Sequence, residues 1–183
     1  MYNWHHSILR EIDTVLNGVA QEDVDALCDV IARSRRIVVF GAGRMGMACR
    51  GFAMRLAHLG KDAHALGDAT VPSIAAGDLL LIASGSGETP SVRLIAEIGV
   101  RDGSTLGVVT ARRQSTIARI ASTVVVIPAP TKVEGEARVV STQPLTTLNE
   151  QCLQIFFDSV VPQLMARLDE TAESMWARHS NLE

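Results

Sequence analysis

The amino-acid sequence predicts an α/β fold, in which a single doubly wound domain is built around a five-stranded parallel sheet flanked by helices. The chain has 183 residues, a common size for one globular domain, and 47% of them are hydrophobic. Five short apolar runs alternate with helical segments along the chain. Four of these runs lack polar alternation, which is typical of parallel strands buried on both faces. Such strands separated by helices form a doubly wound sheet with right-handed crossovers.

Two helices are expected before the first strand. Apolar residues in 4–19 recur at spacings of three and four, which is the stripe of an amphipathic helix that Gly18 ends or interrupts. A second periodic set in 24–31 follows the acidic pair Glu22 and Asp23, and acidic side chains are favoured in the first turn of a helix.

Strands and helices then alternate. The expected strands are RIVVF at 36–40, DAHAL at 62–66, DLLLIA at 78–83, TLGVVT at 105–110 and TVVVIP at 123–128. The helix after the first strand is expected to end at Gly60, and the helix after the third strand near Gly99, because glycine commonly stops a helix.

The C-terminal part starts with the polar, unpatterned segment 131–143, which is expected to be a long surface loop. A long helix follows over 148–168, and Pro162 is expected to kink it. A shorter helix passes through Met175 and Trp176. The expected domain, 1–183, thus divides into N-terminal helices in 1–35, a sheet core in 36–130 and C-terminal helices in 144–178.

Composition and charge exclude several classes of function. Seventeen basic and twenty acidic residues give a net charge of −3, so no general positive field is available to hold a nucleic acid or an anionic membrane surface. The three cysteines show no CxxC spacing, which predicts reduced core thiols and neither a disulfide framework nor a metal site. No apolar run approaches the roughly 18 residues of a membrane span, and the N-terminus lacks a signal-peptide pattern. We therefore expect a cytoplasmic protein without nucleic-acid or membrane partners.

The first glycine-rich turn, GAGRMG at 41–46, follows an expected strand and precedes an expected helix. It matches the dinucleotide fingerprint G-x-G-x-x-G, with Asp62 about twenty residues onward. Glycines also serve any sharp turn from strand to helix, whether or not a pyrophosphate binds there. Asp62 begins the second expected strand, whereas a ribose-binding acid belongs at the end of that strand, where Asp68 is nearer.

The second glycine-rich turn, SGSGET at 84–89, offers three hydroxyls and two glycines just before a helix N-terminus. Backbone amides and the helix dipole can hold a phosphate monoester without a cationic side chain. The Walker pattern is missing, which argues against nucleoside triphosphate hydrolysis. In the alternative interpretation, Ser86 or Thr89 caps the helix and Glu88 is an early acidic residue of it. Capping explains one hydroxyl, so an anion site is favoured.

Together with FAMRLAHLG at 52–60, QPLTTLNEQ at 143–151 and the closing RHSNLE, these turns make nearly the whole chain resemble the sugar isomerase (SIS) domain family, and within it the hexuloisomerase branch. The resemblance implies a flavodoxin-like sheet, no cofactor, and a cytoplasmic homo-oligomer, dimer or tetramer. It also implies a phosphorylated sugar as substrate, with interconversion of 3-hexulose 6-phosphate and fructose 6-phosphate.

The resemblance assigns the proton-transfer base to Glu150. The substrate-binding residues that it implies are Gly43, Arg44, Met45, Ser84, Gly85, Ser86, Gly87, Glu88 and Thr89. The chain departs from the usual family pattern at three of its own positions. Met45 stands where the family usually has serine, Thr146 where it has glycine, and Asn149 where it has phenylalanine. Because two of these changes flank Glu150, they bear on the identity of the substrate more than on the reaction type.

Isomerisation of a sugar moves a proton between neighbouring carbons through an enediol, and one carboxylate can do this if it is kept from water. Glu150 lies at an otherwise apolar helix start, although a glutamate there can also simply complement the helix dipole. His58 and His179 are expected catalytic partners that hydrogen-bond a sugar oxygen or open a ring, or else ordinary core and surface residues. Arg44 is expected to stabilise the enediolate or meet the phosphate, with a surface role as the alternative.

Oligomerisation is also expected from the apolar residues themselves. Phe156 and Phe157 are adjacent on the last long helix, so one stripe cannot hide both, and apolar surface should face another protomer. His179 is then expected to complete a neighbour's site. Two further classes of function stay open: a phosphosugar-sensing module without chemistry, and a nicotinamide-dependent enzyme that uses the first turn. An isomerase acting on another ketose or aldose phosphate is a variant of the main hypothesis.

Overall fold

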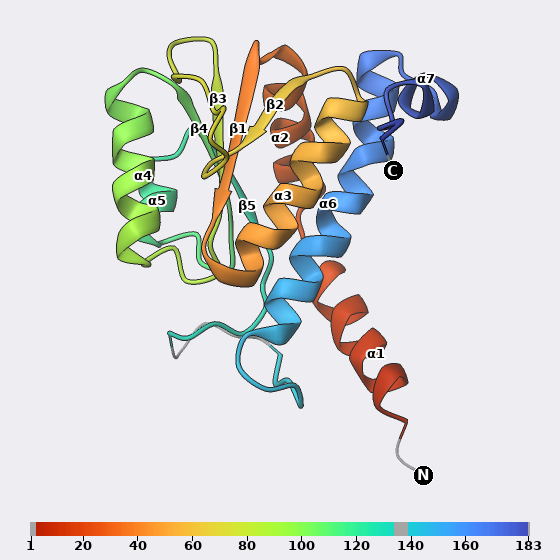
Figure 1. The fold of residues 1–183 in the computed structure, drawn as a ribbon. Helices are drawn as coiled ribbons and strands as arrows, with labels where there is room; N and C mark the ends of the chain where they lie inside the picture. The colour runs from red at the N-terminus through yellow and green to blue at the C-terminus, as the bar shows by residue number, and fades with distance from the viewer. Residues whose placement is uncertain (1–2, 134–138, 183) are drawn as a thin grey trace.

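A computed structural model describes residues 3–133 and 139–182 of the chain. The elements follow one another as α1 (Trp4–Leu16), α2 (Gln21–Arg33), β1 (Arg36–Gly41), α3 (Gly43–His58), β2 (Asp62–Ala65), β3 (Leu79–Ala83), α4 (Pro90–Arg101), β4 (Thr105–Thr110), α5 (Thr116–Arg119), β5 (Thr123–Val126), α6 (Thr147–Leu168) and α7 (Ala172–Ala177). Every strand and helix expected from the sequence is present, with its ends shifted by a few residues (Figure 1).

The five strands form one parallel sheet in the order β2-β1-β3-β4-β5. This is the flavodoxin-like strand order. The strands are added toward one edge of the sheet from β1 to β2 and toward the other edge from β3 onward, so the order switches between β1 and β3. The doubly wound α/β class that the sequence predicts is therefore confirmed. Ligands in such sheets bind at the carboxyl ends of the strands beside this switch point, which directs attention to the turns after β1 and β3.

Helices cover both faces of the sheet, but unequally. Alternate strand residues such as Val39 and Leu81 pack in one cluster with α1, α2, α3 and α6, while Val38 and Leu80 pack in a smaller cluster with α4 and α5. Figure 1 shows these two layers on either side of the strands, with α1 extending away from the body of the domain. The first face is thus the thicker one, and α6 runs along it.

Two expectations about α4 and α6 are wrong. Gly99 lies inside α4, where a Cβ atom would come within 2.4 Å of Leu80, so it allows close packing on β3 and does not stop the helix. The glycine with positive φ after α4 is Gly103. Phe156 and Phe157 are both buried, at 3% and 1% exposure, because α6 is enclosed by α1, α2 and α3. These two side chains therefore give no argument for a second protomer.

The short helix α5 is not indicated by any sequence periodicity, because four residues are too few to display one. Ser115 caps it by accepting a hydrogen bond from the amide of Ala118. Of the expected surface loop 131–143, residues 134–138 lie outside the described part, and no helix or strand is found in the remainder. Within the described residues, no helix has both the length and the apolar character needed to span a membrane.

Candidate active site

A cavity of about 210 Å³ opens at the carboxyl ends of β1 and β3, beside the switch point of the sheet. Three parts of the chain form it: the turn after β1, the turn after β3, and the start of α6. Its lining residues are Ala42, Gly43, Arg44, Met45, Ala83, Ser84, Gly85, Ser86, Thr89, Thr131, Lys132, Thr146, Asn149 and Glu150. The fold thus brings together most of the site residues expected from the sequence, from segments far apart along the chain.

The turn after β3 (residues 84–89) is organised by its own serines. The hydroxyl of Ser84 accepts a hydrogen bond from the amide of Gly87 at 3.2 Å, and the hydroxyl of Ser86 accepts one from the amide of Glu88 at 3.2 Å. Each hydroxyl therefore keeps its own proton for donation, and a phosphate oxygen is a suitable acceptor. Two amides of the turn already have partners, so of the hydroxyls and amides expected to bind an anion, the amides of Gly87 and Glu88 are engaged within the turn.

Other donors of this turn remain available. The amides of Gly85, Ser86 and Thr89 have no acceptor among residues 3–133 and 139–182. Thr89 occupies the N-cap position of α4, but its side chain makes no capping hydrogen bond. The capping interpretation of the two hydroxyls is therefore wrong. The free amides and hydroxyls, together with the N-terminus of α4, are groups that could hold an anion.

Neighbouring segments hold this turn in place. The amide of Ser84 donates to the carbonyl of Val109, and the amide of Ala111 donates to the carbonyl of Gly85, both at 3.0 Å. The hydroxyl of Thr110 also donates to the Gly85 carbonyl, at 3.2 Å. Gly87 has φ +66°, and a Cβ atom there would lie 2.2 Å from Ser115 Oγ. The turn is consequently tied to the end of β4 and to the start of α5.

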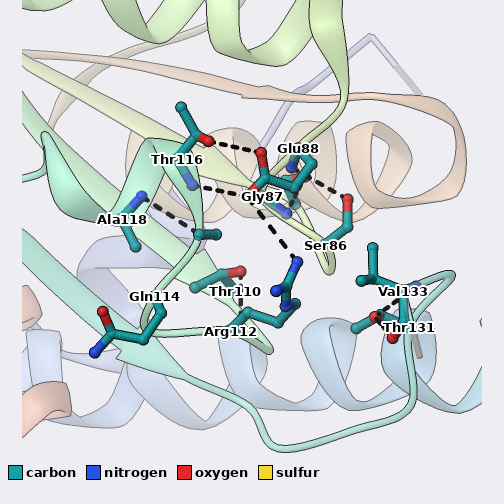
Figure 2. Close-up of polar contacts among 12 residues, drawn as sticks. Ser86, Gly87, Glu88, Thr110, Arg112, Gln114, Thr116, Ala118, Thr131 and Val133 are labelled. Carbon is teal, nitrogen blue, oxygen red and sulfur yellow. Dashed lines mark hydrogen bonds and ion pairs between the residues drawn. The ribbon is translucent and has the colours of Figure 1, made fainter. Parts of the chain in front are cut away.

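Glu88 belongs to this support and not to the cavity lining. Its carboxylate accepts hydrogen bonds from the amide and the hydroxyl of Thr116, at 2.9 and 2.7 Å, and lies 4.0 Å from Arg112. Figure 2 shows the Glu88 side chain beside Thr116 and Arg112. The Thr116 hydrogen bonds are the main reason that the pKa of Glu88 is lowered. Its expected role in substrate binding stays a prediction, as does that of Gly87, which does not line the cavity either.

The turn after β1 (residues 41–46) presents Gly43, Arg44 and Met45 to the same cavity. Gly43 has φ +58°, and a Cβ atom there would meet nothing within 4 Å. The two candidate ribose-binding acids are already engaged, since Asp68 pairs with Arg50, and Asp62 pairs with Arg36 and His64 at the start of β2. The geometry therefore favours the interpretation of this turn as one wall of the cavity over a dinucleotide site.

Glu150 lies in the first turn of α6 with its side chain 16% exposed. Its Oε2 forms an ion pair with Arg44 Nε at 2.8 Å, and its Oε1 accepts a hydrogen bond from Thr146 Oγ1 at 2.9 Å. One carboxylate oxygen is thus held by Arg44 of α3, and the other by Thr146, the residue just before α6. These two contacts fix the orientation of the carboxylate, which lines the same cavity as the turn after β3.

Six lining residues were not among the expected site residues: Ala42, Ala83, Thr131, Lys132, Thr146 and Asn149. Thr146 and Asn149 did carry a signal, because both differ from the usual family pattern beside Glu150. Thr131 and Lys132 carried none, since they follow β5 in a segment without a motif. Their proximity to the cavity depends on how the chain runs after the last strand.

His58 and His179 lie elsewhere in this chain. His58 ends α3, roughly 20 Å along the helix axis from Arg44 at the rise of an α-helix. Its ring centroid is 5.2 Å from that of His179, and Trp176 stacks on His179 at 5.0 Å. These residues line a separate hollow of about 380 Å³ between α3, α6 and α7. Neither histidine reaches the Glu150 cavity within one chain, so their catalytic role stays a prediction about an assembly.

Comparison with known proteins gives concordant results. The sequence matches the SIS domain family over residues 30–167. It is 41% identical over 178 residues to the 3-hexulose-6-phosphate isomerase of Mycobacterium gastri, covering 97% of this chain and 89% of that protein. It is 35% identical over 176 residues to the Bacillus subtilis protein of the same name, covering 96% and 95%.

A solved structure agrees with this result. It is the crystal structure of a Methanococcus jannaschii protein for which a molecular function of 3-hexulose-6-phosphate isomerase has been inferred. The two structures superpose with a TM-score of 0.84 at 28% identity, covering 97% of this chain and 98% of that chain. The likeness therefore extends over the entire fold, including the two turns and the start of α6 that form the cavity.

Proposed function

The chain belongs to the SIS domain family and is a sugar-phosphate isomerase, and we propose that it interconverts 3-hexulose 6-phosphate and fructose 6-phosphate with Glu150 as the base. One observation carries the assignment of the site. The oriented carboxylate of Glu150 shares a single cavity with the hydroxyls and free amides of residues 84–89. A phosphate bound at that turn would place the sugar chain before the carboxylate.

The substrate phosphate would accept hydrogen bonds from the hydroxyls of Ser84, Ser86 and Thr89 and from the free amides of this turn. These groups are neutral, so the site selects a monoester anion by directed donors rather than by a field of positive charge. Lys132 is the one cationic residue at the lining other than Arg44, among the residues the structure describes. It is available to add attraction at the edge of the cavity.

The proposed chemistry is a proton transfer between C2 and C3. Glu150 removes the proton from C2 of 3-hexulose 6-phosphate, the electrons of that C–H bond form the C2–C3 double bond, and O3 becomes the enediolate oxygen. Glu150 then returns the proton to C3, while the O2 proton moves to O3 and the carbonyl forms at C2. Arg44, which contacts Glu150, is positioned to stabilise the enediolate charge as it develops.

We further propose a homo-oligomer, a dimer or a homotetramer, in which His58 or His179 of one subunit serves the site of another. Apolar side chains exposed on the chain support this. Trp4 and Leu9 on α1 are 59% and 57% exposed, Met47 beside the cavity is 70% exposed, and Trp176 next to His179 is 75% exposed. Patches of this kind commonly mark contacts between copies. A stable monomer in sedimentation at working concentration would contradict the proposal.

A cytoplasmic location is part of the same proposal. Cys28, Cys49 and Cys152 are free and buried, which suits a reducing compartment. Burial raises the pKa of the Cys28 thiol to about 11 and those of Cys49 and Cys152 to about 12. The thiols are therefore unreactive packing groups.

The test is exchange of the C3 proton of fructose 6-phosphate with deuterium from solvent, followed by NMR. The native protein should exchange this proton and form 3-hexulose 6-phosphate. Glu150→Gln should lose exchange by at least a hundredfold and keep phosphosugar binding. Asp158→Asn on the same helix is the matched control, because the Asp158 side chain is exposed, accepts a hydrogen bond from Gln154 and does not line the cavity.

The outcomes separate the candidate functions. Binding of fructose 6-phosphate without exchange by the native protein would indicate a sensing module. Exchange with another ketose or aldose phosphate in its place would keep the reaction type and change the substrate. Exchange that survives in Glu150→Gln would remove Glu150 from the role of base.

A further inference from the structure

The start of α6 contains a buried amide that the proposed chemistry does not use. Asn149 is 3% exposed, and its Nδ2 has no hydrogen-bond acceptor in the part of the chain that the structure describes. The same residue lines the cavity that Glu150 shares with residues 84–89, the proposed phosphate-binding turn, called the phosphate turn below. A buried donor without an acceptor is costly in free energy, so it calls for an explanation.

The position of this amide indicates what it can meet. A Cβ atom at Gly85 would lie 3.1 Å from Asn149 Oδ1, 3.3 Å from Cγ and 3.4 Å from Nδ2, so the whole carboxamide lies flat against the phosphate turn. Any side chain at residue 85 would therefore crowd Asn149. Since Glu150 is the next residue of α6 and lines the same cavity, the carboxamide is close both to the group proposed to bind phosphate and to the group proposed to move the proton.

We propose that Asn149 is a specificity-determining residue, whose carboxamide hydrogen-bonds a hydroxyl of the sugar chain between the phosphate and the reacting carbons. This inference rests on the proposed function for the direction in which the substrate lies. In a hexulose 6-phosphate, the hydroxyls of that stretch are those on C4 and C5. A hydroxyl can both donate and accept, so it can pair with either end of a carboxamide.

As a consequence, the site should select ligands whose carbon chain carries a hydroxyl at this position. A site with a buried polar group binds a ligand that satisfies this group, and it discriminates against an analogue without the hydroxyl, because the group is then left unpaired. An apolar side chain at position 149 would lose this discrimination. It would also remove an unpaired donor from the free protein, so the free protein should be no less stable.

The experiment measures dissociation constants by calorimetry for two probes, inorganic phosphate and glucitol 6-phosphate, an acyclic polyol phosphate that needs no turnover to bind. Asn149→Leu is nearly isosteric with the native residue. It should weaken glucitol 6-phosphate binding about tenfold, the value of one hydrogen bond, leave phosphate binding within about twofold and leave the melting temperature unchanged or higher. Gln163→Leu, which removes an amide at the far end of α6 where it pairs with Gln21, is the matched control and should change neither constant.

A second measurement keeps the proposal testable if Asn149→Leu fails to fold. The native protein is titrated with the 4-deoxy and 5-deoxy analogues of fructose 6-phosphate, and one of them should bind about tenfold more weakly than the parent compound. Equal affinities of both analogues, or unchanged glucitol 6-phosphate binding in Asn149→Leu, would overturn the role of Asn149. If these affinities behave as expected and the native protein shows no C3 exchange, the proposed reaction fails while the role of Asn149 stands.

Discussion

The two glycine-rich turns that line the cavity differ in how their central residues are held, although the turn after β1 is closely packed at its ends, where a Cβ atom at Gly46 would lie 2.4 Å from the Gly41 carbonyl oxygen. The turn after β3 is fixed by backbone hydrogen bonds that its own serine hydroxyls accept and by hydrogen bonds with β4, and Gly87 is packed against Ser115. The turn after β1 has open space around Gly43 and carries Arg44, whose side chain is 60% exposed, out to Glu150. We call the turn after β3 the rigid wall and the turn after β1 the open wall. Under the proposed function, the rigid wall would bind the phosphate, which stays in place during the reaction, and the open wall would contact the part of the substrate whose charge changes.

The largest effect should come from adding a methyl group to each turn. Gly87→Ala places a Cβ atom 2.2 Å from Ser115 Oγ at φ +66° and should lower the free energy of unfolding by about 3 kcal/mol. Gly43→Ala has a similar φ of +58° but no neighbour within 4 Å, so it should cost only about 1–2 kcal/mol. Urea unfolding of both variants measures the difference, and equal losses would contradict a rigid wall opposite an open one.

Arg44→Gln tests the open wall. It removes the ion pair with Glu150 Oε2 and the positive charge before the enediolate, so kcat should fall by about ten- to a hundredfold. The affinity for inorganic phosphate should not change, because the phosphate donors lie on the other wall. Steady-state kinetics and calorimetry check this, and a loss of phosphate affinity equal to the loss of kcat would place Arg44 at the phosphate.

Ser86→Ala tests the rigid wall, and here we expect a loss of substrate affinity with little loss of kcat, the opposite of the result expected for Arg44→Gln. The hydroxyl that accepts from Glu88 at 3.2 Å is lost, together with the proton it would donate to the phosphate. Affinity for fructose 6-phosphate should fall about tenfold with a small change in kcat. Ser159→Ala on α6 is the control, because its hydroxyl donates to the Phe156 carbonyl of the same helix and lies outside the cavity lining. An unchanged KM in Ser86→Ala would show that this hydroxyl does not bind the ligand.

Acid should affect the segment before α6 through Glu11 of α1. Burial opposes ionisation there, but hydrogen bonds from Ser141, Thr142 and Gln143 lower the pKa of Glu11 from 4.5 to about 2. Because the folded-state pKa is lowered, this stabilisation is full above pH 4.5 and is lost as the pH falls toward 2. The free energies of unfolding of the native protein and of Glu11→Gln should therefore differ at pH 6 and become similar near pH 2, as measured by denaturant unfolding.

The smallest effect concerns the support of the rigid turn by Glu88. Its pKa is lowered mainly by the hydrogen bonds from Thr116, so the contact is intact above the ordinary glutamate range and weakens as the pH falls through the lowered value. In the native protein, the protection factor of the Thr116 amide against hydrogen exchange should fall as the pH drops below 4.5. In Glu88→Gln this protection factor should be low at all pH values, and a protection factor that does not depend on pH in the native protein would contradict this link.

Prediction from sequence succeeded where a signal is local and repeated. Apolar runs and helical periodicity located the strands and the long helices within a few residues. Turn residues such as Ser84 and Ser86 were found because hydroxyls and glycines cluster beside an expected helix start. The four-residue α5 and the lining residues Thr131 and Lys132 were missed, because neither a short helix nor an unpatterned loop has a period.

The sequence by itself determined the fold class, the order of strands and helices and the two turns, because these depend on the hydrophobic pattern and on backbone preferences of neighbouring residues. Only the tertiary structure decided which side chains share one cavity. It joined Glu150 to Arg44, turned Glu88 away to α5, and buried Phe156 with Phe157. These results depend on the packing of α6 against α3 and of β4 beside β3, and contacts between residues far apart in the chain leave no periodic trace in the sequence.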